Sequence, residues 1–471
     1  MTGAAVTGTV AVVGGGLAGI TAAVALAQVG ARVTLLEARP RLGGATCSFT
    51  RDGLVVDTGQ HVFLGCCTAY RGLLERLGMT AHAPLQRRFD VTVLAPGGRR
   101  ARLRRTALPG PLHMLPALAR YRLLTVTERA AVARPALAMR RLDPADPELD
   151  RQRLGDWLAA HGQSERARRA LWDLFTVSAL NIAGDDASLA LAATVVKTGL
   201  LGRHDAADIG VPALPLGDLH GAAAGALLAR LGARVITGTK ADGIEVTGNG
   251  FRIGLARGAA AITADAVVLA VPHEAAARLL PPGALPPGTV AAWARLGASP
   301  IVNVHVIYDR PVTGLPFAAA VGSPVQWVFD RTRISGLAAA GGTAQYLAVS
   351  LSAADEFAEV PTGKLRERFL PALAALFPAA RDARVTEFFV TRERRATFRQ
   401  APGCGALRPG AGTGLPGLVL AGAWTGTGWP DTMESAVRSG LAAAAHLRRA
   451  LPALTEPDHP DVDASMMGVC R

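Results

Sequence analysis

The chain has 471 residues, half of them hydrophobic, which is enough for two or three domains with sizeable cores. Its formal net charge is +13, but only three of the 50 basic residues are lysine, so nearly all of the positive charge is arginine. Basic and aromatic residues do not interleave as they do in nucleic-acid binding proteins, so we expect no nucleic-acid partner. The five cysteines include no C-x-x-C pair, so we expect reduced thiols in a cytoplasmic protein and no metal site.

The N-terminal stretch has no charged residue between Thr2 and Ala31, a pattern also found in secretory signals and membrane spans. A basic segment ahead of the apolar run is missing, and the glycines at 14, 15 and 16 interrupt the run where a spanning helix needs continuity. We therefore expect this stretch to be part of the fold, and we expect no transmembrane helix.

The same stretch predicts a dinucleotide-binding βαβ unit. The apolar, β-branched run at residues 9–13 is typical of a buried parallel strand and leads directly into G-x-G-x-x-G. Gly14 allows the tight turn, Gly16 lets a pyrophosphate approach the backbone, and Gly19 lets the helix expected at residues 17–29 pack closely on the strand. The N-terminus of this helix would face the anion.

Glu37 ends the second expected strand, residues 32–36, about twenty residues after the glycines. A carboxylate at this position accepts hydrogen bonds from ribose hydroxyls and repels a 2′-phosphate. The motif Arg41-Leu-Gly43-Gly44 extends the unit and points to FAD. We expect non-covalent FAD, because no cysteine or histidine occupies a position that we can connect with covalent attachment.

The middle of the chain contains a predicted β-hairpin followed by a mainly helical segment. The sequence predicts a strand at residues 54–57, a helix at 69–77, a β-hairpin formed by 89–94 and 99–103, and helices at 154–161, 168–180 and 187–198. A stretch of nineteen residues in the hairpin region contains seven arginines: Arg87, Arg88, Arg99, Arg100, Arg102, Arg104 and Arg105. Two interpretations of this cluster stay open, a solvated hairpin and an electrostatic docking patch for anionic lipid headgroups.

Further along, apolar runs and alternation predict more strands and helices. Strands are expected at 234–236, 243–246, 251–255, 266–270, 301–308, 345–351 and 418–421, and helices at 219–231, 364–376 with a break or kink at Pro371, and 432–447. We predict an α/β fold, with a Rossmann-like FAD-binding domain and an inserted mixed α+β substrate domain. The FAD-binding domain comprises residues 1–86, 211–280 and 401–450, the substrate domain residues 87–210, which are mainly helical, and 281–400, and residues 451–471 form a disordered tail.

Nearly the whole chain resembles the flavin-containing amine oxidase and phytoene desaturase-like FAD proteins. The resemblance rests on the segments 14–44, 57–61 and 420–440, which are similar to the hydroxysqualene dehydroxylases, also called squalene-associated FAD-dependent desaturases. Two residues depart from the family pattern. Ala423 stands where an acid is usual, so one flavin hydrogen bond is expected from backbone or water, and Ala45 stands where an arginine often follows the double glycine.

The resemblance also assigns residues to the cofactor. It implies that Gly59, Gln60 and His61 lie beside the isoalloxazine, and that Thr432 and Met433 begin a helix aimed at the flavin pyrimidine edge. The full set is Gly14, Gly16, Leu17, Ala18, Gly19, Glu37, Ala38, Arg39, Arg41, Gly43, Gly44, Gly59, Gln60, His61, Gly422, Ala423, Thr432 and Met433.

The activity implied by the resemblance is the reductive removal of the hydroxyl of hydroxysqualene to give squalene for hopanoid synthesis. His61 is the candidate proton donor, because the ordinary pKa of histidine suits acid catalysis near neutral pH. The alternatives are an isoprenoid desaturase of the phytoene or squalene type and a non-catalytic, flavin-bound lipid carrier. The expected partners are an isoprenoid lipid, the inner face of the plasma membrane through peripheral contact, and neighbouring squalene-pathway enzymes.

Overall fold

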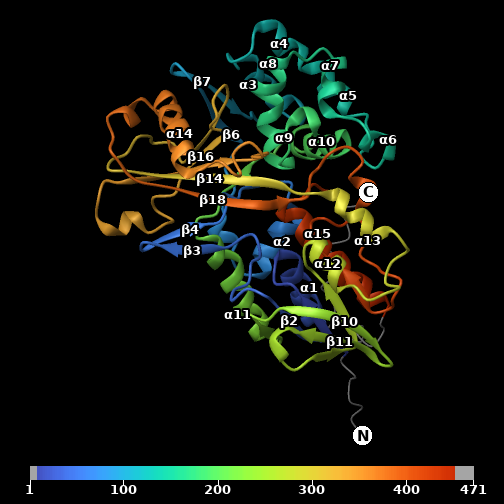
Figure 1. Ribbon diagram of the computed structural model, residues 1–471. Coiled ribbons are helices and arrows are strands. Elements are labelled where there is room, and N and C mark those ends of the chain that lie inside the picture. Colours follow the sequence, from blue (N-terminus) through green and yellow to red (C-terminus); the bar gives the residue numbers. More distant parts are fainter. Residues whose placement is uncertain (1–7, 451–471) are drawn as a thin grey trace.

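A five-stranded parallel sheet organises the lower part of the molecule in Figure 1, with the strand order β19-β13-β1-β2-β9. The computed structural model describes residues 8–450, and the tail expected to be disordered lies outside them. The central strand β1 (Thr9–Val13) pairs in parallel with β2 (Arg32–Leu36) and β13 (Ala266–Leu269). On the two sides follow β9 (Arg234–Ile236) and β19 (Leu418–Leu420), so strands from distant parts of the sequence share one sheet.

The first and last described helices pack against each other beside this sheet. They are α1 (Leu17–Ala27) and α15 (Met433–Ala450). The two backbones are so close that a Cβ added to Gly440 of α15 would lie 2.3 Å from the carbonyl oxygen of Ala18. This packing brings the N-terminal βαβ unit and the C-terminal motif into one body.

A second, seven-stranded sheet crosses the middle of the view, in the order β18-β14-β17-β16-β15-β6-β7. Its neighbouring strands are antiparallel except β15 and β6, which are parallel. Leu365, Phe369 and Leu373 of α14 (Thr362–Leu376) share a buried core with β14. The strands are β6 (Asp90–Ala95), β7 (Arg99–Arg104), β14 (Ser299–Tyr308), β15 (Phe317–Ala320), β16 (Trp327–Asp330), β17 (Gln345–Leu351) and β18 (Val385–Thr397).

Short helices form the upper right of Figure 1. They are α3 (Leu115–Ala119), α4 (Val126–Ala131), α5 (Ala133–Met139), α6 (Pro147–Asp150), α7 (Leu154–Ala160), α8 (Glu165–Ala167), α9 (Asp173–Leu180) and α10 (Leu189–Val196), with π-helical turns at η3 (Arg168–Trp172) and η5 (Lys197–Leu201). Between residues 8 and 450, no helix combines the length and the apolar character needed to cross a bilayer.

The remaining elements surround the parallel sheet or connect it to the seven-stranded one. They are β3 (Ser48–Arg51), β4 (Leu54–Asp57), β5 (Phe63–Leu64), α2 (Thr68–Arg76), β8 (Ile209–Gly210), η6 (Gly217–Ala222), α11 (Ala223–Arg230), β10 (Ala241–Thr247), β11 (Gly250–Leu255), β12 (Ile262–Ala264), α12 (His273–Leu279) and α13 (Thr289–Ala292). β10, β11 and β12 form a separate three-stranded antiparallel sheet.

The predicted fold class is confirmed, and the expected strands and helices recur within a few residues of their predicted bounds. The break expected as one possibility at Pro371 does not occur, because α14 continues through this residue as one helix. Its buried residues Leu365, Phe369 and Leu373 lie on both sides of the proline and fix both halves against the sheet, which outweighs the lost backbone hydrogen bond. The five boundaries between the six predicted segments stay predictions.

Candidate functional site

The glycine loop between β1 and α1 is a steric requirement of the fold. Gly14 has φ +109°, and a Cβ there would lie 2.2 Å from the carbonyl oxygen of Ala270. A Cβ on Gly19 would lie 1.8 Å from the carbonyl oxygen of Gly14. The residue ahead of α1, Gly16, is extended and provides no side-chain cap. The first turn of α1 therefore presents backbone N–H groups that can donate hydrogen bonds to an anion.

Glu37 is held rigidly at the end of β2. Its side chain is buried, with Oε2 accepting a hydrogen bond from the Gly15 N–H at 2.7 Å and Oε1 accepting one from the Arg39 N–H at 2.8 Å. A carboxylate has about four acceptor positions, so two of them are left for a ribose diol. The sequence predicts this carboxylate at the end of the second strand. In the structure it directly follows β2 and contacts the glycine loop.

The double glycine contacts the same loop. The Gly43 N–H donates to the Gly15 carbonyl at 2.8 Å, and a Cβ on Gly44 would lie 2.8 Å from Cα of Gly16. Both glycines have positive φ, which other residues adopt at a cost. Arg41 donates to Sγ of Cys47 at 3.0 Å. The segment 41–44 thus closes one side of the glycine loop.

The loop that follows β19 begins at the edge of the parallel sheet, on the side of β1 opposite to β2. Two serines of α15 hold it, Ser439 accepting from the Gly422 N–H at 2.8 Å and Ser435 donating to the Ala423 carbonyl at 3.0 Å. Thr432 caps the helix, with Oγ1 accepting from the Ser435 N–H at 3.3 Å. The backbone at Ala423 is therefore ordered although the acid usual in the family is missing.

Arg408 supports this loop and was not found from the sequence. Its guanidinium donates to the carbonyl oxygens of Ala423 at 3.0 Å and Thr425 at 2.6 Å and lies over the Phe398 ring at 5.1 Å. Burial lowers its pKa, although no arginine loses its charge at neutral pH. No local pattern marks Arg408, because its partners are backbone carbonyls fifteen or more positions away.

The segment expected beside an isoalloxazine follows β4. Asp57, the last residue of β4, forms a buried ion pair with Arg331, and its Oδ1 accepts from the Leu216 N–H at 3.0 Å. Asp57 therefore anchors the turn to other parts of the chain. The next residue, Thr58, donates to the carbonyl of Ala45 at 2.8 Å, which links this segment to the double glycine.

His61 lies in this segment with its proton position defined. Its Nδ1 is 3.1 Å from the Gly59 carbonyl, which can only accept, so Nδ1 carries the hydrogen. Burial lowers the pKa of His61 below 6.5, more than the carbonyl and Asp57 raise it. The neutral ring therefore keeps Nε2 as an acceptor. Its role as a proton donor stays a prediction.

Two oxygens near this segment are buried without any hydrogen-bond partner, Oε1 of Gln60 and Oδ1 of Asn303. The amide Nδ2 of Asn303 donates to the Thr58 carbonyl at 3.3 Å, which places Asn303 against the same turn. Buried acceptors usually have partners, so an absent donor group is expected here. The open N-terminus of α1, the glycine loop and these two oxygens together fit a dinucleotide with a polar ring system.

Two further titratable groups, the buried His305 and the half-buried Asp431, were not found from the sequence. His305 of β14 contacts Tyr346 Oη at 2.7 Å and Thr391 Oγ1 at 3.0 Å, and burial lowers its pKa to about 3. Asp431, two residues ahead of α15, accepts from the Phe398 N–H at 2.9 Å, and burial raises its pKa to about 6. Asp431 is thus a carboxyl poised to exchange a proton near neutral pH.

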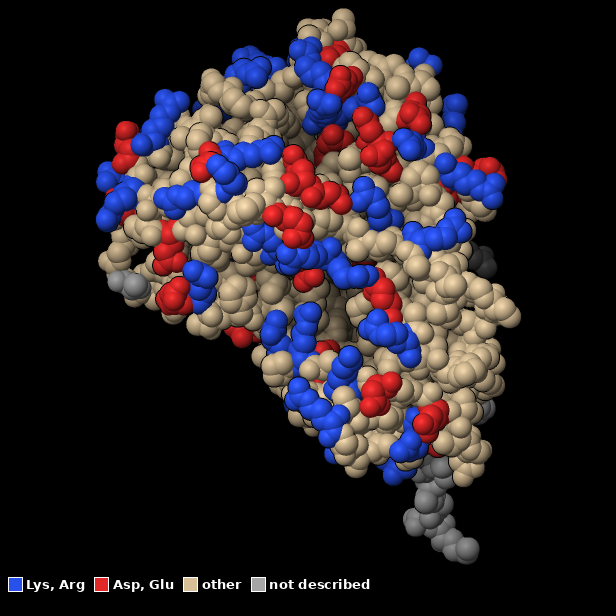
Figure 2. All heavy atoms as spheres, viewed as in Figure 1, with Lys and Arg blue, Asp and Glu red and all other residues tan. Residues whose placement is uncertain are grey.

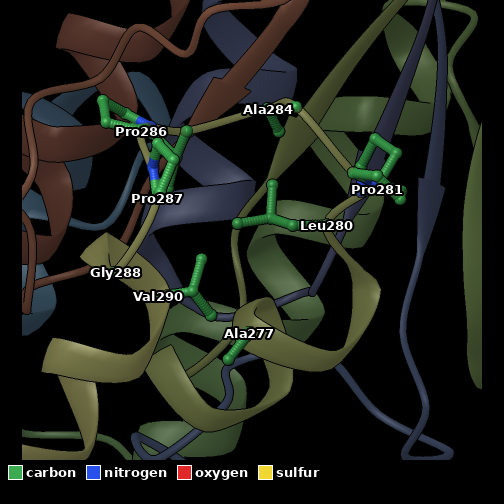
Figure 3. Close-up of a pocket in the computed structure, with 11 residues that line it drawn as sticks. Ala277, Leu280, Pro281, Ala284, Pro286, Pro287, Gly288 and Val290 are labelled. Carbon is green, nitrogen blue, oxygen red and sulfur yellow. The ribbon is translucent and has the colours of Figure 1, made fainter.

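Two cavities outside this region have a different character. One, of about 270 Å³, lies between α12 and α13 and is lined by Leu280, Val290 and several prolines (Figure 3). The other, of about 420 Å³, lies beside β7 and is bordered by Arg99, Arg166 and Arg169. None of the residues assigned to the cofactor lines either cavity. Among the described residues, no group of His, Cys, Asp and Glu could hold a metal ion.

Comparisons with known proteins agree with this arrangement. The family model of flavin containing amine oxidoreductases matches residues 17–448. Hydroxysqualene dehydroxylase of Rhodopseudomonas palustris is 30% identical over 452 residues, covering 93% of this chain and 97% of that protein. Zeta-carotene desaturase of Zea mays is 26% identical, covering 93% and 83%. Among solved structures, putrescine oxidase bound to putrescine aligns with a TM-score of 0.70 at 20% identity, covering 94% and 99%, a likeness of fold alone.

Proposed function

Because the chain belongs to the flavin containing amine oxidoreductase family, we propose that it binds FAD non-covalently and removes the hydroxyl group of hydroxysqualene to give squalene. The observation that carries the substrate assignment is the similarity to a hydroxysqualene dehydroxylase over nearly the full length of both chains. The observation that supports FAD is a buried carboxylate, Glu37, fixed beside an open helix N-terminus. The reaction is one step in making a precursor of hopanoids.

Each part of FAD has candidate ligands in the site. The N-terminus of α1 would bind the pyrophosphate, because its N–H groups and helix dipole favour negative charge. Glu37 would accept hydrogen bonds from the adenosine ribose. The segment from Gly59 to His61 and the N-terminus of α15 would contact the ring system. Backbone groups at Gly422 and Ala423 would replace the missing acid near the ribityl chain.

When bound and reduced, the flavin supplies the hydride that replaces the departing hydroxyl. The chain must then do two things: deliver a proton to the hydroxyl so that it leaves as water, and keep other nucleophiles away from the allylic cation. Two titratable groups could supply the proton: His61, whose ring is neutral, and Asp431, which lies two residues ahead of α15 and has a raised pKa.

The reaction can be tested with the flavin as its own reporter. The purified protein is photoreduced without oxygen, hydroxysqualene is added, and recovery of the oxidised absorbance band is followed while lipids are extracted. Reoxidation with one squalene formed per flavin is the expected result. A reduced flavin that stays reduced, with unchanged hydroxysqualene, would exclude the dehydroxylase.

A second candidate is an isoprenoid desaturase, which the similarity to zeta-carotene desaturase favours. A desaturase takes a hydride from its hydrocarbon, so squalene or phytoene would bleach the oxidised flavin. If neither experiment changes the flavin although lipid stays bound, a flavin-bound lipid carrier is the remaining function.

We also propose where the protein works. Because its substrate is a membrane lipid, the protein would be cytoplasmic and in peripheral contact with the inner face of the plasma membrane. Association with neighbouring squalene-pathway enzymes would shorten the transfer of a substrate that water does not dissolve. Co-purification of these enzymes from gently lysed cells tests the association.

A further inference from the structure

The positive charge of the chain is concentrated in one segment. Residues 87–141 contain thirteen arginines, no lysine and two acidic residues, Asp90 and Glu128, so the segment carries +11 of the chain's formal +13. The remaining residues of the chain are close to neutral in sum. A general coding bias toward arginine would spread the charge evenly, so the concentration needs a local explanation.

The same segment carries most of the large apolar side chains that the structure leaves exposed. Five of the seven such residues lie in it, between 44% and 72% exposed: Leu108, Leu112, Leu115, Val126 and Leu137. The other two, Val62 and Val246, lie far apart in the sequence. Single exposed leucines are common, but several of them within one short, basic segment indicate an interaction surface.

The local fold holds three of these leucines outward, and we call Leu108, Leu112 and Leu115 the apolar tip. After β7 the chain folds back on itself, with the Thr106 N–H donating to the His113 carbonyl at 2.9 Å. His113 is buried and Met114 and Leu118 pack against the core, so the neighbours of the tip anchor it. The tip is therefore presented on an ordered surface.

Exposed arginines lie on elements next to the apolar tip, since α3, which begins at Leu115, contacts β7. Arg99, Arg100, Arg120 and Arg122 are exposed and form no ion pair among the described residues, and we call them the arginine rim. Arg105 does not belong to it, because its guanidinium is buried against Asp208 at 2.6 Å. In Figure 2, blue side chains stand along the upper edge of the molecule, where Figure 1 places β7, α3 and α4.

We propose that this face docks on an anionic lipid bilayer, with the apolar tip inserted at the headgroup boundary and the arginine rim against lipid phosphates. The inference rests on the peripheral contact proposed above and names the surface that makes it. Apolar side chains next to unpaired cations are the pattern of interfacial membrane binding. Binding of single-stranded nucleic acid uses exposed aromatic residues for stacking, and the exposed large apolar residues of the described part of the chain are all leucine or valine.

Sedimentation of the flavin-loaded protein with vesicles tests the proposal. We expect strong binding to phosphatidylcholine vesicles that contain phosphatidylglycerol, and much weaker binding to phosphatidylcholine alone. The double variant Leu112→Ser/Leu115→Ser should lower the partition coefficient at least tenfold on both. Arg99→Gln/Arg100→Gln should lower it severalfold on anionic vesicles only, and 0.5 M salt should have the same effect.

Matched variants elsewhere on the surface control for general effects. Val246→Ser removes an exposed apolar side chain, and Arg230→Gln/Arg234→Gln removes two exposed arginines. Both control proteins should bind vesicles like the unmodified protein. Equal losses in test and control variants, or unchanged binding of Leu112→Ser/Leu115→Ser, would overturn the proposal. Turnover of hydroxysqualene dissolved in detergent separates the two proposals. The leucine variant should match the unmodified protein in this assay, and failure of both proteins to turn over hydroxysqualene would reject the dehydroxylase assignment while the vesicle result still stands.

Discussion

Gly440 of α15 offers the most direct test of how the two ends of the chain build one site. Replacing it by alanine places a methyl group 2.3 Å from the Ala18 carbonyl oxygen and 2.9 Å from Cβ of Thr21. The oxygen belongs to the backbone of α1 and cannot rotate away. The helices must therefore separate, and the loop that Ser435 and Ser439 hold must move with α15.

The size of the effect follows from two opposing terms. Alanine in a helix is favoured over glycine by about 1 kcal/mol. Overpacking a close contact costs about 1–3 kcal/mol, with the upper end expected against rigid backbone. Gly440→Ala should therefore lower the free energy of unfolding by about 1–2 kcal/mol. Because the N-terminus of α15 shifts as well, FAD should also bind less tightly.

Gly225 provides the matched control, because it lies within α11 and a Cβ there would meet no atom within 4 Å. Gly225→Ala gains the same helix propensity without a clash and should raise the free energy of unfolding by about 1 kcal/mol. The two variants are compared by thermal unfolding with and without added FAD, and by the flavin-to-protein absorbance ratio. Equal unfolding temperatures and flavin contents for both variants would refute the close packing of α1 and α15.

Three other substitutions probe the buried charges. Asp57→Ala leaves the Arg331 guanidinium buried without its partner, so urea unfolding should show a loss of about 3–5 kcal/mol, and a stability unchanged within 1 kcal/mol would contradict the buried pair. Glu37→Gln replaces one acceptor oxygen by a donor beside two backbone N–H groups, so the Kd for FAD from fluorescence titration should rise about tenfold to a hundredfold. Asp431→Asn should stabilise the protein at pH 8 by at most about 3 kcal/mol, because a pKa raised to about 6 makes ionisation of the folded state costly above that pH, and the gain should vanish as the pH falls from 6 toward 4. A gain that is the same at pH 8 and pH 4 would show that ionisation of Asp431 is not its cause.

The βαβ unit could be predicted because its evidence is local. Continuous apolar runs mark the buried strands, and the glycines mark turns where a Cβ would strike backbone, as at Gly14 and Gly19. The order of strand, glycine, helix and acid then defines the site without any long-range information. The same reasoning located β13 and β19, since a buried parallel strand reads as an apolar run wherever it occurs.

Elements that depend on distant partners could not be predicted. β15 reads Phe-Ala-Ala-Ala, which has little strand propensity, and it becomes a strand because β6 and β16 pair with both of its edges. β18 runs through the charged residues 392–395, and it stays extended because β14 pairs with most of its length. Periodicity shows which side of a segment is buried, but it does not show which residue of a distant segment lies opposite.

The same limit applies to the polar groups of the site that are buried or half-buried. Arg408, Asn303 and Asp431 are single polar residues whose partners lie elsewhere in the chain. His61 was identified because a resemblance singled out its segment. Its protonation state depends on the Gly59 carbonyl and on burial, which only the structure provides.

The protonation of His61 leads to a prediction about turnover. With its hydrogen on Nδ1 and directed at the Gly59 carbonyl, the neutral ring has no proton on Nε2 to give, and burial lowers the pKa of the ring below 6.5. If His61 protonates the departing hydroxyl, the rate of flavin reoxidation by hydroxysqualene should rise about tenfold for each unit of pH from 8 to 6.5, because only the protonated fraction reacts.

Asp431 would produce the same rise above pH 6.5, so variants are needed to separate the two residues. A carboxyl with a pKa of about 6 is mostly protonated below that pH, so the rate should level off there. Asp431→Asn should then abolish the pH dependence together with most of the rate, whereas His61→Ala should leave the profile in place. The opposite pair of results, a lost profile in His61→Ala and an unchanged one in Asp431→Asn, would assign the proton to His61. Unchanged rates in both variants would exclude both residues and leave a water molecule as the donor.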